Sequence, residues 1–92
     1  MQIAQIIGTV VATRKHECLV GSKIQVIQPL KPGSQEPEGE PFVAIDTVGA
    51  GVGEIVIIVR GSGARQAVDN EKMPIDAAII GIIDQLDIEK IQ

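Results

Sequence analysis

Residues 42–65, FVAIDTVGAGVGEIVIIVRGSGAR, decide the fold because two apolar runs flank a glycine-rich segment. The first run covers residues 42–45, and the second, IVIIV at 55–59, is apolar at every position. β-Branched side chains are stiff at χ1 and suit the pleated backbone of a strand, so both runs predict strands. A strand that is apolar on both faces is expected to be covered on both sides. In a small domain a closed barrel covers one face, and a neighbouring subunit can cover the other.

The segment between the two runs carries glycine at alternate positions, Gly49, Gly51 and Gly53, and is followed by Glu54. Such glycines allow positive φ and the close approach of another backbone. A dinucleotide loop needs G-x-G-x-x-G, whereas this segment reads G-A-G-V-G. A phosphate site also needs a helix N-terminus, but here an acid and a predicted strand follow. The segment therefore argues against nucleotide binding.

Outward from this stretch, the chain predicts three more strands, in residues 1–13, 23–30 and 79–83. A helical turn is expected at 64–68, after the Gly-Ser-Gly turn. In the first strand Ile6 and Val10 are expected on one face, and Gly8 is expected to mark a bend or bulge. Five short strands and one helical turn predict an all-β protein, a small five-stranded OB-like barrel.

Composition indicates an assembly rather than an isolated barrel. The 92 residues make one domain, and 45% of them are hydrophobic with a single aromatic, Phe42. A chain this small buries only roughly 60–65% of the surface that its unfolded form exposes. The surplus of Ile and Val side chains therefore favours oligomerisation. The formal net charge of −4 argues against a general nucleic-acid binder, since neutralising phosphates needs a Lys/Arg surface.

The residues that often carry chemistry are sparse. Cys18 is the only cysteine, which excludes an intrachain disulfide and fits a reducing compartment. His16 lies two residues away, but a structural zinc site wants four Cys or His ligands. The Gly-Ser-Gly around Ser62 is too short for a nucleophile elbow. No leader pattern and no apolar run of about 18 residues is visible, so a soluble cytosolic protein is expected.

Acidic side chains are the remaining candidates for acid–base chemistry. They are spread over predicted loops and strand ends, where acids are ordinarily solvated, at Asp46, Glu54, Asp69, Asp76 and Asp84. We therefore predict no catalytic residue, cofactor or metal. An enzyme that uses these acids stays as a rival hypothesis, which requires a pocket with convergent carboxylates.

Four motifs in the same order resemble the EutN/CcmL family, the vertex proteins of bacterial microcompartments and carboxysomes. They are M-x-I-A-x-I-x-G-x-V-x-A-T-x-K at 1–15, A-I-D-T-V-G-A-G-x-G-E at 44–54, G-S-G-A-R at 61–65 and D-A-A-I-I-G-I-I-D at 76–84. Gly63 departs from the G-S-S-A-R that the family often shows. Because the resemblance ends at Asp84, residues 1–84 are predicted as the barrel domain and 85–92 as a C-terminal tail.

The resemblance implies a structural, non-catalytic protein of the bacterial cytoplasm that forms homopentamers. Such pentamers cap the vertices of a polyhedral shell, so the implied partners are other copies and hexameric shell proteins, not nucleic acid or a membrane. It also implies a set of residues at the subunit interface or central channel: Asp46, Thr47, Gly49, Gly51, Gly53, Glu54 and Arg65.

Two questions stay open at the level of sequence. OB-like wedges can close into rings of five or six subunits. The alternative function is an OB-type module that binds a small ligand or single-stranded nucleic acid. Such a module usually needs a basic groove and stacking aromatics, and the chain has neither Trp nor Tyr.

Overall fold

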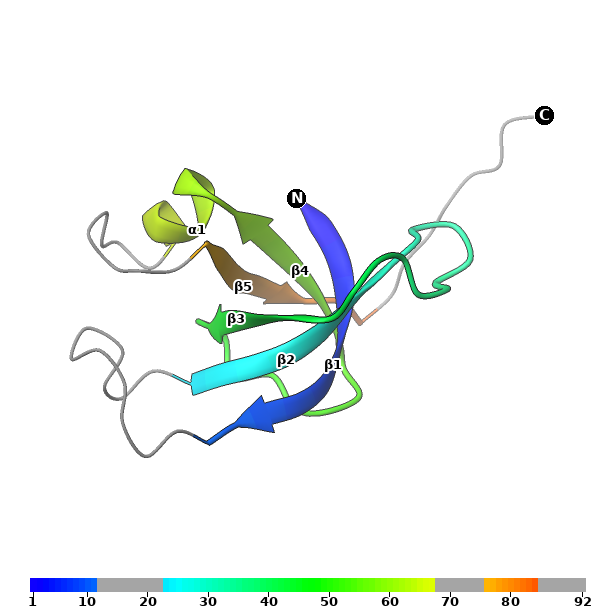
Figure 1. Cartoon of the computed structure of the whole chain (residues 1–92), viewed down its shortest axis with the longest axis horizontal. Helices are drawn as coiled ribbons and strands as arrows, with labels where there is room; N and C mark the ends of the chain where they lie inside the picture. Colours follow the sequence, from blue (N-terminus) through cyan, green and yellow to red (C-terminus); the bar gives the residue numbers. More distant parts are fainter. Residues whose placement is uncertain (12–22, 68–75, 85–92) are drawn as a thin grey trace.

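The protein is a small closed β-barrel in the computed structural model, which describes residues 1–11, 23–67 and 76–84 (Figure 1). The order around the barrel is β1-β2-β3-β5-β4. Its elements are β1 (Gln2–Val10), β2 (Lys23–Leu30), β3 (Phe42–Asp46), β4 (Ile55–Arg60), α1 (Ser62–Ala67) and β5 (Ala77–Ile82). The predicted fold class, an all-β five-stranded barrel with one short helical turn, is confirmed.

The predicted elements differ from the observed ones mainly at their ends. β2 begins and ends where the sequence placed it, and β5 begins two residues before the predicted 79–83. The helical turn expected at 64–68 is α1, which begins at Ser62. The tail at 85–92, together with His16 and Cys18, lies outside the described residues.

The barrel is closed by one short parallel pair. β3 and β5 run parallel and pair at Ile45↔Ala78 and Asp46↔Ile79, whereas the other neighbouring strands are antiparallel. β1 pairs with β2 along most of its length but with β4 only up to Gln5. Beyond Gln5 the free edge of β1 is met by the loop at 47–54, which crosses the barrel between β3 and β4 (Figure 1).

A bulge in β1 changes which residues face the core. The register with β2 shifts between Ile6 and Gly8, so the bulge expected near Gly8 is confirmed. Ile6 is buried inside the barrel, whereas Val10 pairs with the outward Ile24. The expectation that Ile6 and Val10 share a face is therefore wrong, because one extra residue in a strand reverses the alternation that follows it.

The core consists of aliphatic side chains on the inner faces of the strands. On β4, Val56 and Ile58 are fully buried, while Ile55 and Ile57 are half-buried and alternate with them. Burying a Val or Ile side chain stabilises a fold by about 1.5–3 kcal/mol. The sequence predicted that both faces of β4 are covered. Within one chain the barrel covers only the inner face of this strand.

Among the described residues one polar side chain, Gln25 of β2, is fully buried in this core. Its Oε1 accepts a hydrogen bond from Thr9 Oγ1 at 2.8 Å. Its Nε2 donates to the backbone oxygen of Ala50 at 2.8 Å and to Asp46 Oδ2 at 3.1 Å. A buried amide without partners is strongly destabilising, so these three bonds are what allow Gln25 to sit there.

We expect Gln25→Leu to lower the free energy of unfolding by about 1–3 kcal/mol, because it removes the three hydrogen bonds that join β2 to Thr9, Asp46 and Ala50. The matched control is Gln66→Leu on the exposed side of α1, which should change stability by no more than about 0.5 kcal/mol. The measurement is urea unfolding followed by far-UV circular dichroism at one fixed protein concentration. Equal effects of the two substitutions would contradict a structural role for the buried amide.

A candidate site at the glycine-rich loop

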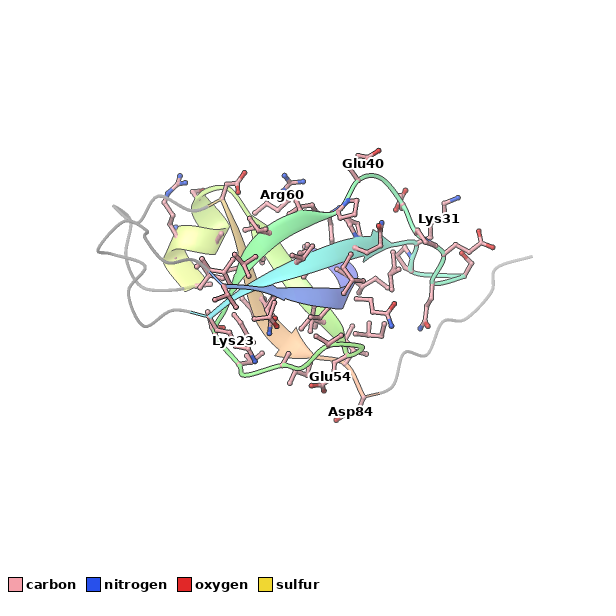
Figure 2. All side chains as sticks on the ribbon, turned by 60° about the horizontal axis from the view of Figure 1, so that its bottom comes forward. Lys23, Lys31, Glu40, Glu54, Arg60 and Asp84 are labelled. Atoms are coloured by element: carbon pink, nitrogen blue, oxygen red, sulfur yellow. The ribbon has the colours of Figure 1, made fainter. Side chains whose placement is uncertain are left out.

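The predicted site residues from Asp46 to Glu54 form one structured loop along a side of the barrel (Figure 2). The Asp46 carboxylate holds the start of this loop. Its Oδ1 accepts hydrogen bonds from the backbone N–H groups of Val48 and Gly49, both at 2.9 Å. Its Oδ2 accepts one from the N–H of Ala50 at 2.8 Å. Aspartate is suited to this position because its short side chain reaches backbone groups two to four residues ahead.

These bonds also set the ionisation of Asp46. Burial raises the pKa of this carboxyl, but hydrogen bonds from Val48, Gln25, Gly49 and Ala50 together outweigh burial and lower the pKa below its usual 3.8. Hydrogen bonds to the charged form favour it. The carboxylate is therefore ionised near neutral pH, where it organises the loop.

Ala50 anchors the middle of the loop in the barrel. Its side chain is fully buried in the core cluster. Its backbone oxygen accepts hydrogen bonds from Gln25 Nε2 at 2.8 Å and from Lys23 Nζ at 2.9 Å. The loop is thus part of the barrel wall rather than a free excursion.

The end of the loop extends the pairing of β1. The N–H of Gly53 donates to the oxygen of Ile6 at 2.8 Å, and the N–H of Ile6 donates to the oxygen of Glu54 at 3.0 Å. Gln5 Nε2 donates to the oxygen of Gly53 at 3.1 Å. Glu54 Oε1 in turn accepts the N–H of Gly51 at 2.6 Å. These bonds satisfy the edge of β1 where β4 no longer pairs with it.

The three alternating glycines have different local roles. Gly49 and Gly53 have φ values of 78° and 94°, a region that residues with a side chain rarely adopt. Gly51 has no positive φ, and a Cβ added there would lie 3.4 Å from Glu54 Oε1, close to ordinary contact. The backbone of a single chain therefore requires glycine at positions 49 and 53 but not at 51.

Of the other two predicted site residues, Thr47 belongs to the loop and Arg65 lies outside it. Thr47 follows β3, and its Oγ1 donates to the oxygen of Ile79 at 2.6 Å, which ties the loop to β5. Arg65 is on α1, which packs against β4 and β5, outside the loop. Sequence reasoning missed Lys23 and Gln25 as partners of the loop. The sequence did hold a signal for Gln25, because it is predicted on the same strand face as the apolar Ile27 and so toward the core.

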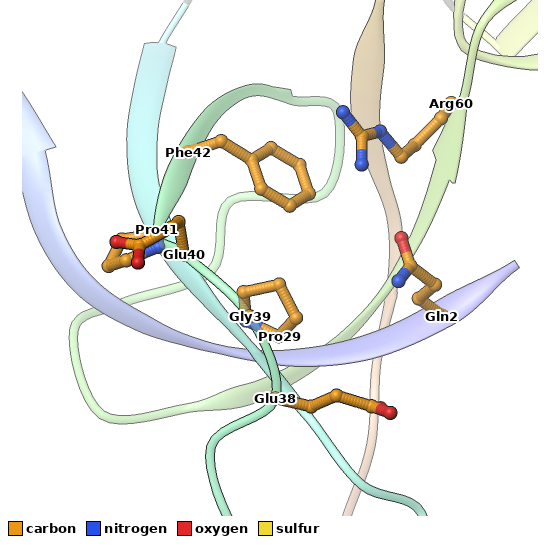
Figure 3. A pocket seen from close by; sticks show the side chains of 8 residues that line it. All are labelled: Gln2, Pro29, Glu38, Gly39, Glu40, Pro41, Phe42 and Arg60. Carbon is orange, nitrogen blue, oxygen red and sulfur yellow. The ribbon is translucent and has the colours of Figure 1, made fainter.

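A shallow open pocket of about 390 Å³ lies at another part of the barrel surface (Figure 3). It is lined by Gln2, Pro29, Glu38, Gly39, Glu40, Pro41, Phe42 and Arg60. The Arg60 guanidinium lies 4.2 Å from the Phe42 ring centroid, a cation–π contact. The side chains of Glu38 and Glu40 point away from this pair, so the pocket does not converge its carboxylates as an acid–base site requires (Figure 3).

Two further observations hold for the described part of the chain. No three His, Cys, Asp or Glu side chains in it are grouped so that they can hold a metal ion. No helix within these residues has the length and apolar character needed to cross a membrane.

Most of the chain matches one family. The family model described as "Ethanolamine utilisation protein EutN/carboxysome" matches residues 1–84. Relatives include the bacterial microcompartment shell vertex protein GrpN of Rhodospirillum rubrum, 46% identical over 95% of this chain and 97% of the relative. Another is the carboxysome shell vertex protein CcmL of Synechococcus elongatus, which is 48% identical over 97% of this chain and 89% of the relative.

Solved structures agree with the family match. A structure titled "Ethanolamine utilization protein, EutN" has a TM-score of 0.90 at 40% identity, with 95% of this chain and 90% of the other covered. A second structure is described as GrpN, a pentameric microcompartment shell protein from Rhodospirillum rubrum. It has a TM-score of 0.86 at 45% identity, with 97% of this chain and 100% of the other covered. The chain therefore belongs to the EutN/CcmL family, and the resemblance found in the sequence is confirmed.

The pKa of Asp46 predicts an acid-dependent stability. A carboxyl with a lowered folded-state pKa stabilises the fold above its usual pKa of 3.8, and this contribution is lost as pH falls through the folded value. We expect Asp46→Asn to be less stable than the unmodified protein near pH 7. Below about pH 4 its stability should fall less steeply, because one linked proton is missing.

The measurement is thermal unfolding by far-UV circular dichroism across this pH range. Asp84→Asn serves as the control, since it removes an exposed carboxylate outside the loop. If Asp46→Asn and the unmodified protein lost stability in parallel below about pH 4, the Asp46 carboxylate would not be the linked group.

Proposed function

We propose that the protein is a structural shell component of a bacterial microcompartment, forming homopentamers that cap the vertices of the shell in the bacterial cytoplasm. The observation that carries this proposal is similarity over nearly the whole chain to relatives named as shell vertex proteins, one of which is described as pentameric. The proposed role involves no catalysis and no cofactor.

The geometry of a closed polyhedral shell supports a role for a fivefold ring. A heterologous contact, in which one face of a subunit meets a different face of the next, closes into a ring when its rotation permits. Flat layers of hexamers need fivefold points in order to curve and close. We accordingly propose hexameric shell proteins as the partners of the ring, with the same barrel repeated five times around an axis.

We also propose that the glycine-rich loop and Arg65 lie at the subunit interface or the central channel. Val48 and Val52 in the loop are 39% and 64% exposed, so the loop presents apolar side chains outside the barrel. Gly51 supports this placement, because the local backbone does not demand glycine there. A close approach by a neighbouring copy gives a reason for the missing side chain.

Substitutions at two glycines separate folding from assembly. We expect Gly51→Val to lose the pentamer while its far-UV circular dichroism stays that of the folded barrel. Gly49→Val, which forces a β-branched residue to positive φ, should instead lower the free energy of unfolding by about 1–2 kcal/mol. Native mass spectrometry measures assembly, and a Gly51→Val protein that remained pentameric would contradict the need for a small residue.

The proposed assembly fixes the mass in solution. Five copies of the 9.7 kDa chain give about 48 kDa. The measurement is size exclusion with light scattering and refractive-index detection, because the chain has no Trp or Tyr for absorbance. A six-chain species would contradict the fivefold geometry, and a monomer would contradict the ring and favour the OB-type binding module.

A further inference from the structure

We infer that two separate uncharged faces of the barrel form the two halves of the ring contact, so that one face of each copy packs on the other face of the next. This inference rests on the proposed pentamer and specifies which surfaces build it. The occupant of each face is a second copy of this chain.

The first surface, called the β2 face, consists of the outward side chains Val10, Ile24, Val26 and Val43. Its members are neighbours across three strands. Val26 pairs with Gly8 of β1 on one side and with Val43 of β3 on the other, and Ile24 pairs with Val10. Val43 is 52% exposed in the single chain, and the others are half-buried.

The second surface, called the β4 face, consists of the outward side chains Ile3, Ile55 and Ile57. Ile57 lies between Ile3 of β1 and Gly81 of β5. A Cβ at Gly81 would lie 3.6 Å from the Ile57 side chain. Because Gly81 has no side chain, this side of Ile57 is not covered by its neighbour on β5. All three isoleucines are half-buried, whereas the inward Val56 and Ile58 of the same strand are fully buried.

Charged side chains are absent from both faces, as is typical of the buried centre of an interface. Neither face contains a charged side chain, although 22% of the residues in the chain are charged. The labelled charges in Figure 2 lie at strand ends and in loops: Lys23, Lys31, Glu40, Glu54, Arg60 and Asp84. Depletion of charge is the compositional mark of the buried centre of protein interfaces. Both faces therefore have the composition of surfaces that are covered in the assembled protein.

The two faces share no residue and are centred on different strands, which points to a heterologous contact. An isologous contact would use one face twice and stop at two subunits, whereas a ring needs two complementary faces on every copy. The faces are centred on β2 and on β4, which flank β1 in the barrel order. The relative described as pentameric shares this barrel with a TM-score of 0.86, so a second copy is the occupant that the observations support.

The test uses one aspartate on each face. Val43→Asp disables the β2 face and Ile57→Asp disables the β4 face, so each protein alone should be a folded monomer of about 9.7 kDa. Mixed in equal amounts, they should form a two-chain species of about 19 kDa, twice 9.7 kDa, because each retains the face that the other lacks. Gln35→Asp, in the exposed loop after β2, adds the same charge and should remain pentameric.

Each outcome supports or overturns the inference. A pentamer formed by either folded variant alone overturns the assignment of that face, and folded monomers that do not combine overturn the pairing of the two faces. If circular dichroism shows that an aspartate variant is unfolded, Val43→Thr or Ile57→Thr replaces it. Those variants should raise the concentration at which the pentamer dissociates by about tenfold or more, and an unchanged concentration overturns the inference. An unmodified protein that is not pentameric would instead overturn the proposed function.

Discussion

The hydrogen bonds among Asp46, Gln25 and Ala50 are the constraint on which the closure of this barrel depends. β3 and β5 share only a short parallel pairing, and β4 leaves β1 after Gln5. The remaining gap is filled by the loop after β3, whose middle is fixed in the core by Ala50. If these bonds were absent, the loop would expose its own backbone and the edge of β1 to the interior, and buried unpaired groups are costly.

The small size of the core makes this polar tie necessary. The interior is built from Ile, Val and Ala, and Phe42 lies only half-buried at its edge, against the Arg60 guanidinium. Small inner residues such as Ala4 and Ala44 let strands and loop approach closely, so the interior is filled by backbone as well as by side chains. A loop at that depth needs side-chain partners for its backbone, which Asp46 and Gln25 provide.

The same size limit connects the fold with assembly. A barrel of five short strands has an inner face that few residues fill, so the remaining Ile and Val side chains must lie on its outer surface. The structure gathers several of them into the β2 face and the β4 face and leaves charges at the strand ends. A subunit with two uncharged faces and polar ends is suited to a ring, and its relatives include a protein described as a pentameric shell component.

The sequence by itself determined the strands, the all-β class and the family, because period-two patterning, β-branched runs and ordered motifs are local properties of the chain. Only the tertiary structure decided that Val10 turns outward after the bulge, that Gln25 lies inside, and that Gly49 differs from Gly51. The physical reason is that each of these depends on register and hydrogen bonds between residues far apart in the sequence. A one-residue shift in pairing reverses every face that follows it, and local composition does not record it.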